Sequence, residues 1–578
     1  MAWETKSPYA YLEQLKKQPE LRGKMYAHQA ELPRLPVPDL RNACERYLKA
    51  VRPVINGAIP DLSPAERSAM LAATEANVAE FCKPGGRGEE LHRRLLEHEE
   101  KCKAAGEASW LKRWWLYAAY HADPTPIPVN SNVYCVSRDH PISVIQEVDW
   151  VCRAAAMIEH SMIFSRMIDN GDVPVDTAGK RKLCMDQYTR VLRTVRIPGE
   201  TADHIVTYPP EQSRHVIILV RDHFFALDAL EPDLTPRPAA ALLPDLEDIL
   251  AVAETLPPAD GIGVFTYEYR PVWAKARARL LEHSATNAAS LEAIQSAQSI
   301  FIFDENRPTT RQEIGRLALQ GDGRNRFFDK TSQLIIFRNG KMGFNAEHSP
   351  FDAPPTAHGN MSFTTAMETV EEYIKLHQLR RWGPPQSLLG PPTSAPEPNP
   401  AGFPGAGGAP QTPAATAGSR WRLLSFDVPA DVRAMQAKAV LTAKHLIQSS
   451  QLEFLEYQPY GMEVRGLRAC AHAAPRAAPH AARMRGMLVW RAGAQFIRRK
   501  ARLSPDSYLQ MALQLAYYRV YGHFASTYET QQTRAFLHGR TGASCAGAVV
   551  ARGEPRAEPP GVGCGGRAGA GGQKRAGR

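Results

Sequence analysis

The chain has 578 residues, of which 44% are hydrophobic and 22% are charged, and its formal net charge is +10. This length allows two or more domains with large cores, and the composition is ordinary for a soluble globular protein. No run of about 18 apolar residues occurs, so we expect no membrane span. The opening MAWETKSPYAYLEQLKK lacks the patterns of secretory signals and transit peptides, which favours a cytoplasmic protein.

The positive charge is concentrated in two segments. Residues 461–493 hold six Arg and one Glu, and residues 542–578 hold five Arg, one Lys and two Glu. These segments account for nearly all of the net charge, so the rest of the chain is close to neutral. A basic, Gly-rich tail can bind nucleic acid. This tail has no aromatic side chains that could stack on bases, and nucleic acid is therefore not an expected partner, although the tail keeps that rival interpretation open.

Residues 1–95 are predicted to form helices joined by Pro-rich turns. The segment LPRLPVPDL at 32–40 alternates proline with apolar residues and should be extended. In the following NACERYLKAVRPVI, the residues Ala43, Tyr47, Leu48 and Val51 recur at helical spacing.

Residues 96–383 alternate helical and strand patterns. VCRAAAMIEHSMIFSRMI at 151–168 is typical of a buried helix, and the apolar runs HVIILV at 215–220 and QLIIF at 333–337 are typical of strands. This mixture predicts an α/β or α+β layer domain.

The second half is interrupted by low-complexity sequence. Residues 384–418 are rich in Pro, Gly and Ala, which predicts a flexible insertion. Globular patterning resumes at RWRLLSFDV, is broken at 462–494, and returns in SPDSYLQMALQLAYYRVYGHF, an amphipathic helix. We expect residues 419–541 to form a second domain that is incomplete, and 542–578 to be a disordered tail.

The strongest local candidate for chemistry is GKMGFNAEHSPFDA at 340–353. A strand and an Asn339-Gly340 turn lead into a loop that carries His348, and Asp352 follows four residues later. A carboxylate at this spacing can hold an imidazole in one tautomer, which frees the other ring nitrogen to act as a general base. Because the chain has 18 His, about one such pair arises by chance, and a loop histidine beside a solvated acid is the competing interpretation.

Wider similarity supports the catalytic interpretation. The relevant motifs, in chain order, are LPRLPVPDL, WLKRWWLYAAYHADPTPIPVNSN, MDQYTRVLRTVRIPGETAD with Arg196, Pro198 and Asp203, FTYEYRPVWAKAR, GDGRNRFFDK, GFNAEHSPFDA, LSPDSYLQMALQLAYYRVYG and TYETQQTRAFLHGRT. In these motifs and in their order, the chain resembles the choline/carnitine O-acyltransferases over about 1–383, 419–461 and 495–541.

The resemblance implies a two-domain fold similar to chloramphenicol acetyltransferase, with His348 as the base and Asp352 as its carboxylate partner. It implies direct attack of an alcohol on an acyl-CoA thioester, with coenzyme A as a substrate and no bound cofactor. No nucleophile motif such as G-x-S-x-G is present, and the nine scattered cysteines form no C-x-x-C pair, so neither an acyl-enzyme nor a metal site is expected.

The resemblance also assigns the substrate-binding residues. Arg499 and Lys500 would meet the 3′-phosphate of coenzyme A, to which basic side chains are suited, and Asp506 and Glu529 would lie near its nucleotide. The competing interpretation of this basic run is a solvent-exposed start of the following helix that binds no ligand. The family usually has Gly-Lys before the run, where this chain has Ala494-Gln495.

Tyr528 and Thr541 match positions whose hydroxyls bind the carboxylate of carnitine. Choline enzymes carry an apolar residue at the position of Thr541, so this residue favours carnitine. The competing interpretation is that Thr541 only caps a turn of the backbone. The expected activity is therefore acyl transfer, with a short acetyl group, between coenzyme A and carnitine. The alternatives are a choline O-acyltransferase and an inactive family member that binds coenzyme A or a partner protein.

The sequence departs from the family at residues 462–494 and after Thr541. The family's later Arg for the carnitine carboxylate, its Ser-Thr-Ser and its final strands have no counterpart in 542–578. We expect the chain as written to have little or no activity. The oligomeric state stays open, as does a peroxisomal or mitochondrial address.

Overall fold

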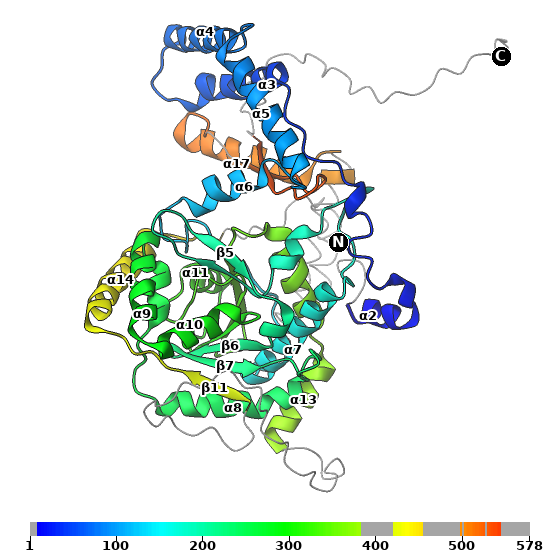
Figure 1. Cartoon of the computed structure of the whole chain (residues 1–578), viewed down its shortest axis with the longest axis vertical. Coiled ribbons are helices and arrows are strands. Elements are labelled where there is room, and N and C mark those ends of the chain that lie inside the picture. The colour runs from blue at the N-terminus through cyan, green and yellow to red at the C-terminus, as the bar shows by residue number, and fades with distance from the viewer. Residues whose placement is uncertain (1–7, 383–419, 455–496, 500–501, 526–528, 545–578) are drawn as a thin grey trace, which may run out of the picture. The chain divides into compact units, whose positions relative to one another are not determined.

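The computed structural model describes residues 8–382, 420–454, 497–499, 502–525 and 529–544 (Figure 1). The chain divides into two compact units. The larger comprises Met1–Val37, Leu91–Gly493 and Thr530–Ala543, and the smaller comprises Pro38–Glu90, Ala494–Glu529 and Ser544–Arg578. The segment boundaries expected from composition stay a prediction, since 384–418, 462–494 and most of the tail lie outside the described residues.

A seven-stranded mixed sheet forms the centre of the larger unit, in the order β1-β10-β9-β8-β6-β7-β11 (Figure 1). Its strands are β1 (Val133–Val136), β6 (His215–Val220), β7 (His223–Asp228), β8 (Ile300–Asp304), β9 (Gln333–Phe337), β10 (Met342–Ala346) and β11 (Trp421–Leu424). β6 is parallel to β8 and β8 to β9, whereas the outer pairs are antiparallel. The strands predicted at 215–220 and 333–337 are confirmed as β6 and β9.

Helices cover both faces of this sheet, which explains why β6 is apolar at every position after His215. Successive side chains of a strand point to opposite faces, and β6 follows this rule. Val216 and Ile218 pack into the core beneath α7 (Trp150–Asp169), α8 (Ala239–Thr255) and α13 (Val370–Trp382). Ile217 and Leu219 pack against α10 (Ala285–Ser296) and α11 (Arg311–Gln320). The α/β class expected from the sequence is confirmed.

The helix predicted at 151–168 is confirmed as α7. Asp149 caps its first turn by accepting hydrogen bonds from the backbone N–H groups of Val151 (2.9 Å) and Cys152 (3.2 Å), and such a cap stabilises a helix by about 0.5–2 kcal/mol. Nearly all of its side chains are buried, because it packs against the sheet, α8, α12 and α13.

A third apolar cluster joins α9 (Arg270–His283) to α14 (Ala430–Ser449). The rings of Phe265 and Trp273 stack at a centroid distance of 5.1 Å within it. From α14 this cluster includes Val432, Ala439 and Ala443. The segment after the low-complexity insertion thus returns to the same unit as the central sheet.

Apart from α5, the remaining described elements of the larger unit are short. The helices are α2 (Pro8–Lys17), most of α5 (Arg87–Ala104), α6 (Lys112–Leu116) and α12 (Ser362–Ala366); two-stranded sheets join β2 (Thr177–Ala178) to β3 (Arg181–Lys182), β4 (Thr194–Ile197) to β5 (His204–Thr207), and β12 (Glu529–Gln532) to β13 (Thr541–Ser544). The 3-10 helices are η1 (Pro19–Leu21), η2 (Gln29–Glu31), η5 (Pro141–Val144), η6 (Asp186–Arg190), η7 (Pro210–Gln212) and η8 (Ile262–Tyr267); the π-helical turns are η4 (Tyr117–His121), η9 (Pro354–Met361) and, in the smaller unit, η3 (Val54–Ala58).

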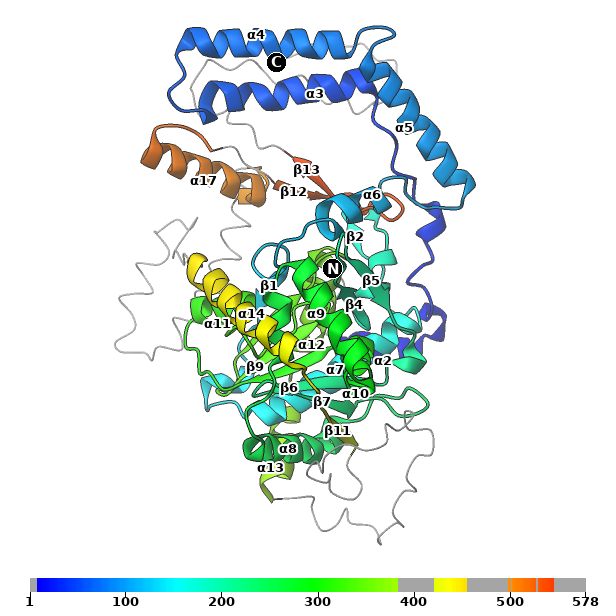
Figure 2. The same cartoon turned by 60° about the vertical axis from the view of Figure 1, so that its left-hand side comes forward.

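The described residues of the smaller unit are mainly helical. They include α3 (Leu40–Pro53), α4 (Pro64–Phe81), the start of α5, and α17 (Pro505–Tyr521). α3 and α4 lie side by side (Figure 2), and α4 begins with a capping box between Ser63 and Glu66. The helices predicted after LPRLPVPDL and within SPDSYLQMALQLAYYRVYGHF are confirmed as α3 and α17. Among the described residues of both units, no helix is long and apolar enough to cross a membrane.

Candidate active site

A tight turn and the strand β10 of the central sheet precede His348, which lies two residues beyond the last residue of that strand. The turn between β9 and β10 contains Gly340, whose φ is +68° and whose added Cβ would lie 2.4 Å from the carbonyl oxygen of Val148, so only glycine fits. β10 then pairs with β1 and β9 up to Ala346. The chain leaves the sheet immediately afterwards, and His348 remains partly exposed while both of its neighbours are buried.

The imidazole of His348 is held by a backbone carbonyl. Its Nδ1 lies 2.8 Å from the carbonyl oxygen of Phe351. A carbonyl oxygen can only accept a hydrogen bond, so Nδ1 carries the proton and Nε2 keeps its lone pair. Burial lowers the pKa of His348 below its usual value, the carboxylate of Asp352 opposes this effect, and the guanidinium of Arg540 reinforces it. The ring is therefore neutral at neutral pH and can accept a proton at Nε2.

Asp352 does not take the place on the ring that its spacing suggested. Among the described contacts, its carboxylate accepts hydrogen bonds from Gln187 Nε2 (2.9 Å) and from Arg540 (3.2 Å). Its backbone N–H also donates to Gln187 Oε1 (2.7 Å). The conformation of the loop places the carbonyl oxygen of Phe351, and not the carboxylate of Asp352, beside Nδ1 of His348. Asp352 is buried at the end of this loop and is the ion-pair partner of Arg540.

Arg540 binds the loop that carries His348. Its guanidinium donates to the carbonyl oxygens of Ser349 (2.5 Å) and His348 (3.2 Å), and it lies over the ring of Tyr120 at 5.6 Å. The Tyr120 ring in turn meets the His348 ring edge to face, with centroids 5.6 Å apart. Sequence reasoning missed Arg540. The sequence Gly-Arg-Thr at 539–541 was interpreted only as a turn cap at Thr541, and it does not indicate a contact of Arg540 with the loop.

A buried ion-pair network supports the other side of His348. The carboxylate of Glu347 accepts hydrogen bonds from the backbone N–H (3.0 Å) and hydroxyl (2.7 Å) of Ser349 and pairs with Arg196 (3.2 Å). Arg196 pairs with Asp203 (2.6 Å), which also binds Arg270 (2.7 Å). Two residues of the MDQYTRVLRTVRIPGETAD motif thus lie beneath the candidate base.

The other predicted site residues are not brought together with His348 by the described structure. Arg499 is exposed in a short helical turn at 497–499, Asp506 lies in the first turn of α17, and Glu529 begins β12. These three residues belong to the smaller unit. Thr541 begins β13 in the larger unit, and only its backbone is described; Lys500 and Tyr528 lie outside the described residues. The binding roles of all six residues stay predictions.

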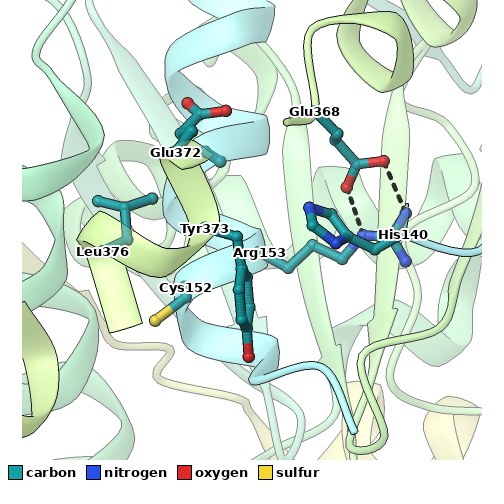
Figure 3. Close-up of a pocket in the computed structure, with 8 residues that line it drawn as sticks. His140, Cys152, Arg153, Glu368, Glu372, Tyr373 and Leu376 are labelled. Carbon is teal, nitrogen blue, oxygen red and sulfur yellow. Dashed lines mark hydrogen bonds and ion pairs between the residues drawn. The ribbon is translucent and has the colours of Figure 1, made fainter. Parts of the chain in front are cut away.

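Two cavities lie elsewhere in the larger unit. One, of about 340 Å³, is lined by the β6–β7 turn, residues 256–262 and the end of β11. The other has only about 10 Å³, enough for about one water, beside the bidentate ion pair of Arg153 and Glu368 (2.6 and 2.9 Å; Figure 3). This ion pair, together with the hydrogen bonds of Arg153 to the carbonyls of Gly340 and Arg138 (2.5 and 3.0 Å), ties α7 to the turn before β10. It thereby supports the strand that ends near His348.

Similarity to known proteins agrees with this geometry. The family model for Choline/Carnitine o-acyltransferase matches residues 35–469 and 470–546. The carnitine O-acetyltransferase of Columba livia is 29% identical over 540 residues, which cover 90% of this chain and 71% of that protein. The human carnitine O-acetyltransferase is 28% identical over 533 residues (89% and 70%), and the human peroxisomal carnitine O-octanoyltransferase is 29% identical over 527 residues (89% and 72%).

The family match covers most of the described chain, including the loop of His348 and the segment that ends in Arg540. The matching relatives are named as acyltransferases that act with carnitine. The central mixed sheet, the neutral histidine after β10 and this match point to the same conclusion: the chain belongs to the choline/carnitine O-acyltransferase family.

Proposed function

We propose that this protein transfers a short acyl group reversibly between coenzyme A and carnitine, with His348 as the general base. The observation that carries the proposal is the state of the imidazole. Its Nδ1–H is bound to the carbonyl of Phe351, its pKa is lowered by burial, and His348 as a residue is still partly exposed. A base with its lone pair on Nε2 at neutral pH suits proton removal from an alcohol.

The proposed reaction needs no protein nucleophile. Nε2 of His348 takes the proton from the carnitine hydroxyl while the hydroxyl oxygen attacks the thioester carbonyl of the acyl-CoA. The tetrahedral intermediate collapses, the carbon–sulfur bond breaks, and the leaving thiolate receives the proton from the imidazolium. The Phe351 carbonyl keeps the ring in place through both proton transfers, because Nδ1 remains protonated throughout.

Carnitine is the proposed acceptor for two reasons. The relatives named above carry carnitine in their names, and Thr541 matches a position that is apolar in choline enzymes. Tyr528 would bind the same carboxylate. The acyl chain is proposed to be acetyl, whereas relatives of similar identity include an octanoyltransferase, so chain length has to be decided by experiment.

Coenzyme A is proposed to bind through Arg499 and Lys500, with Asp506 and Glu529 near its nucleotide. The exposure of Arg499 leaves its guanidinium available to a phosphate group, and arginine binds phosphate oxygens in a bidentate manner. Coenzyme A enters and leaves as a substrate and is not a resident cofactor. A cytoplasmic location stays a prediction.

A thiol-release assay tests the proposed function. Acetyl-CoA and octanoyl-CoA are each offered with L-carnitine, with choline, or without an acceptor, and the released coenzyme A is measured. Two proteins are compared: the chain as written, and the chain in which residues 542–578 are replaced by the ending of a carnitine O-acetyltransferase. The His348→Ala variant of each protein is the control.

We expect carnitine-dependent release from acetyl-CoA with the family ending, and little or none with the chain as written. Release with choline alone would overturn the choice of acceptor, and a preference for octanoyl-CoA would overturn the choice of acyl group. Binding of coenzyme A without transfer by either protein would support an inactive, coenzyme A-binding family member instead.

A further inference from the structure

We propose that Arg540 is a positioning residue that fixes the conformation of the loop 348–352 and thereby the tautomer and orientation of the His348 ring. The effect of this contact on the reaction rests on the proposed function, whereas its effect on the ring does not. Arg540 lies close to the C-terminal end of the described chain and reaches the loop from 188 residues away in the sequence.

One guanidinium joins both ends of this loop. At the first end it donates to the carbonyl oxygens of His348 and Ser349 (3.2 and 2.5 Å). At the other end it pairs with the carboxylate of Asp352 at 3.2 Å. The hydrogen bond that holds the ring, from Nδ1 of His348 to the carbonyl of Phe351, lies between these ends. The separation of residues 348 and 351 therefore depends on the geometry of Arg540.

A second side chain shows that this arrangement is built into the fold. Gln187 donates from Nε2 to Asp352 Oδ2 (2.9 Å) and to the carbonyl oxygen of Gly539 (3.0 Å), and it accepts from the backbone N–H of Asp352 (2.7 Å). Gln187 is 1% exposed. It thus ties the end of the loop to the residue directly before Arg540.

The segment that carries Arg540 is anchored independently of the loop. Arg534 is fully buried, pairs with Asp176 (2.7 Å) and donates to the carbonyl oxygen of Cys184 (2.8 and 3.0 Å). The backbone N–H of Leu537 donates to the carbonyl oxygen of Pro33 (2.8 Å). Arg534 is therefore a matched control: it is a buried, ion-paired arginine of the same segment that makes its ion pair with Asp176 and its backbone hydrogen bonds with Cys184, neither of which belongs to residues 348–352.

The fork of the guanidinium, more than its charge, is the functional feature. Arg540 uses several N–H groups in one plane to reach two carbonyls and one carboxylate. A lysine would keep the positive charge beside Asp352 and would lose this fork. Arg540→Lys therefore separates a positioning role from a purely electrostatic one, and it also keeps a cation for the buried carboxylate so that the fold is retained.

Nuclear magnetic resonance of the full chain with ¹⁵N-labelled histidine tests the proposal without requiring catalysis. His348→Gln assigns the signal. We expect His348 of the unmodified chain in one tautomer, protonated at Nδ1, and we expect mixed tautomers in Arg540→Lys and Arg540→Gln. Arg534→Lys should keep the single tautomer. Thermal unfolding and circular dichroism confirm that each variant is folded.

An unchanged Nδ1-protonated tautomer in folded Arg540→Lys and Arg540→Gln would overturn the positioning role. Loss of the single tautomer in Arg540→Gln alone, with Arg540→Lys unchanged, would mean that only the positive charge of Arg540 matters. That result would also overturn the positioning role. Mixed tautomers in Arg534→Lys to the same extent would mean that the whole segment, and not Arg540, determines the ring.

Kinetics then connect the ring to the reaction. In the protein with the family ending, which keeps Arg540, we expect Arg540→Lys to lower kcat by about 10²-fold, as a displaced catalytic group does, and to leave KM for acyl-CoA within about twofold, since uniform binding is not altered. Activity retained by His348→Ala would refute the proposed function. An inactive His348→Ala beside a fully active Arg540→Lys would refute only the positioning role.

Discussion

Removal of the His348 imidazole is expected to lower kcat by on the order of 10²–10⁴-fold, as the loss of a general base does. The protonation state of His348 in the structure is consistent with this fall in kcat. Burial holds the pKa of His348 below 6.5, so more than about 90% of the molecules carry a neutral ring at pH 7.5. Nearly every molecule would therefore lose a working base in His348→Ala. KM for acetyl-CoA should change little.

The assay is steady-state acyl transfer to carnitine by the protein with a family ending, measured from about pH 5.5 to 8.5. The protonated ring has no lone pair on Nε2, so kcat/KM should fall as the pH falls through the pKa of His348, with a midpoint below 6.5. His283 is a suitable control, since it is partly exposed and pairs with Asp427 on the surface. His283→Ala should keep both the rate and the pH profile.

Activity of His348→Ala within about tenfold of the unmodified protein would remove His348 from the mechanism. A midpoint of the acid limb clearly above 6.5 would contradict the argument that burial governs the ring. Either result would show that the neutral, carbonyl-bound imidazole is a structural feature of the loop and not the base.

Four further predictions follow from the structure and the proposed site. Asp352→Asn should leave the buried Arg540 without its anion, lowering the free energy of unfolding by roughly 3–5 kcal/mol in urea titrations and lowering kcat less than His348→Ala does. Asp203→Asn should cost a similar roughly 3–5 kcal/mol by the same measurement, because one carboxylate oxygen binds Arg196 and Arg270 at 2.6 and 2.7 Å; a loss below about 1 kcal/mol would argue against it. Burial lowers the pKa of His215 to about 4, so about 3 kcal/mol of stability, present above pH 6.5, should be lost as the pH falls to about 4, and the acid sensitivity of unfolding should be smaller in His215→Gln. Thr541→Val should raise KM for carnitine by the equivalent of roughly 1.5–3 kcal/mol and spare KM for acetyl-CoA, whereas an unchanged carnitine KM would favour the choline alternative.

Local patterns in the sequence were sufficient for several elements. The helix α7 and the strands β6 and β9 have the bounds that apolar periodicity and β-branched runs indicated, within one or two residues. Burial on both faces of the sheet explains why β6 has an unbroken apolar pattern. The sequence analysis placed His348 in a loop after the strand at 333–337 and the Asn339-Gly340 turn, but it missed β10 (Met342–Ala346), which lies between that turn and His348.

The partners of His348 could not be predicted in the same way. The spacing of Asp352 suggested a carboxylate on the ring, but the contact is the carbonyl of Phe351, and a backbone group has no identity in the sequence. Arg540 carried no signal for its role, because its contacts are made across about 190 residues.

The sequence by itself therefore determined the candidate base, the α/β class and the resemblance to acyltransferases, since each depends on residues that are neighbours along the chain. Only the tertiary structure decided which group holds the ring, and that Asp352 pairs with Arg540. The same is true of the buried network that joins Glu347 to Arg196 and Asp203. The physical reason is that hydrogen bonds and ion pairs between distant segments depend on how the sheet, its helices and the last described segment pack together, and no local periodicity records that packing.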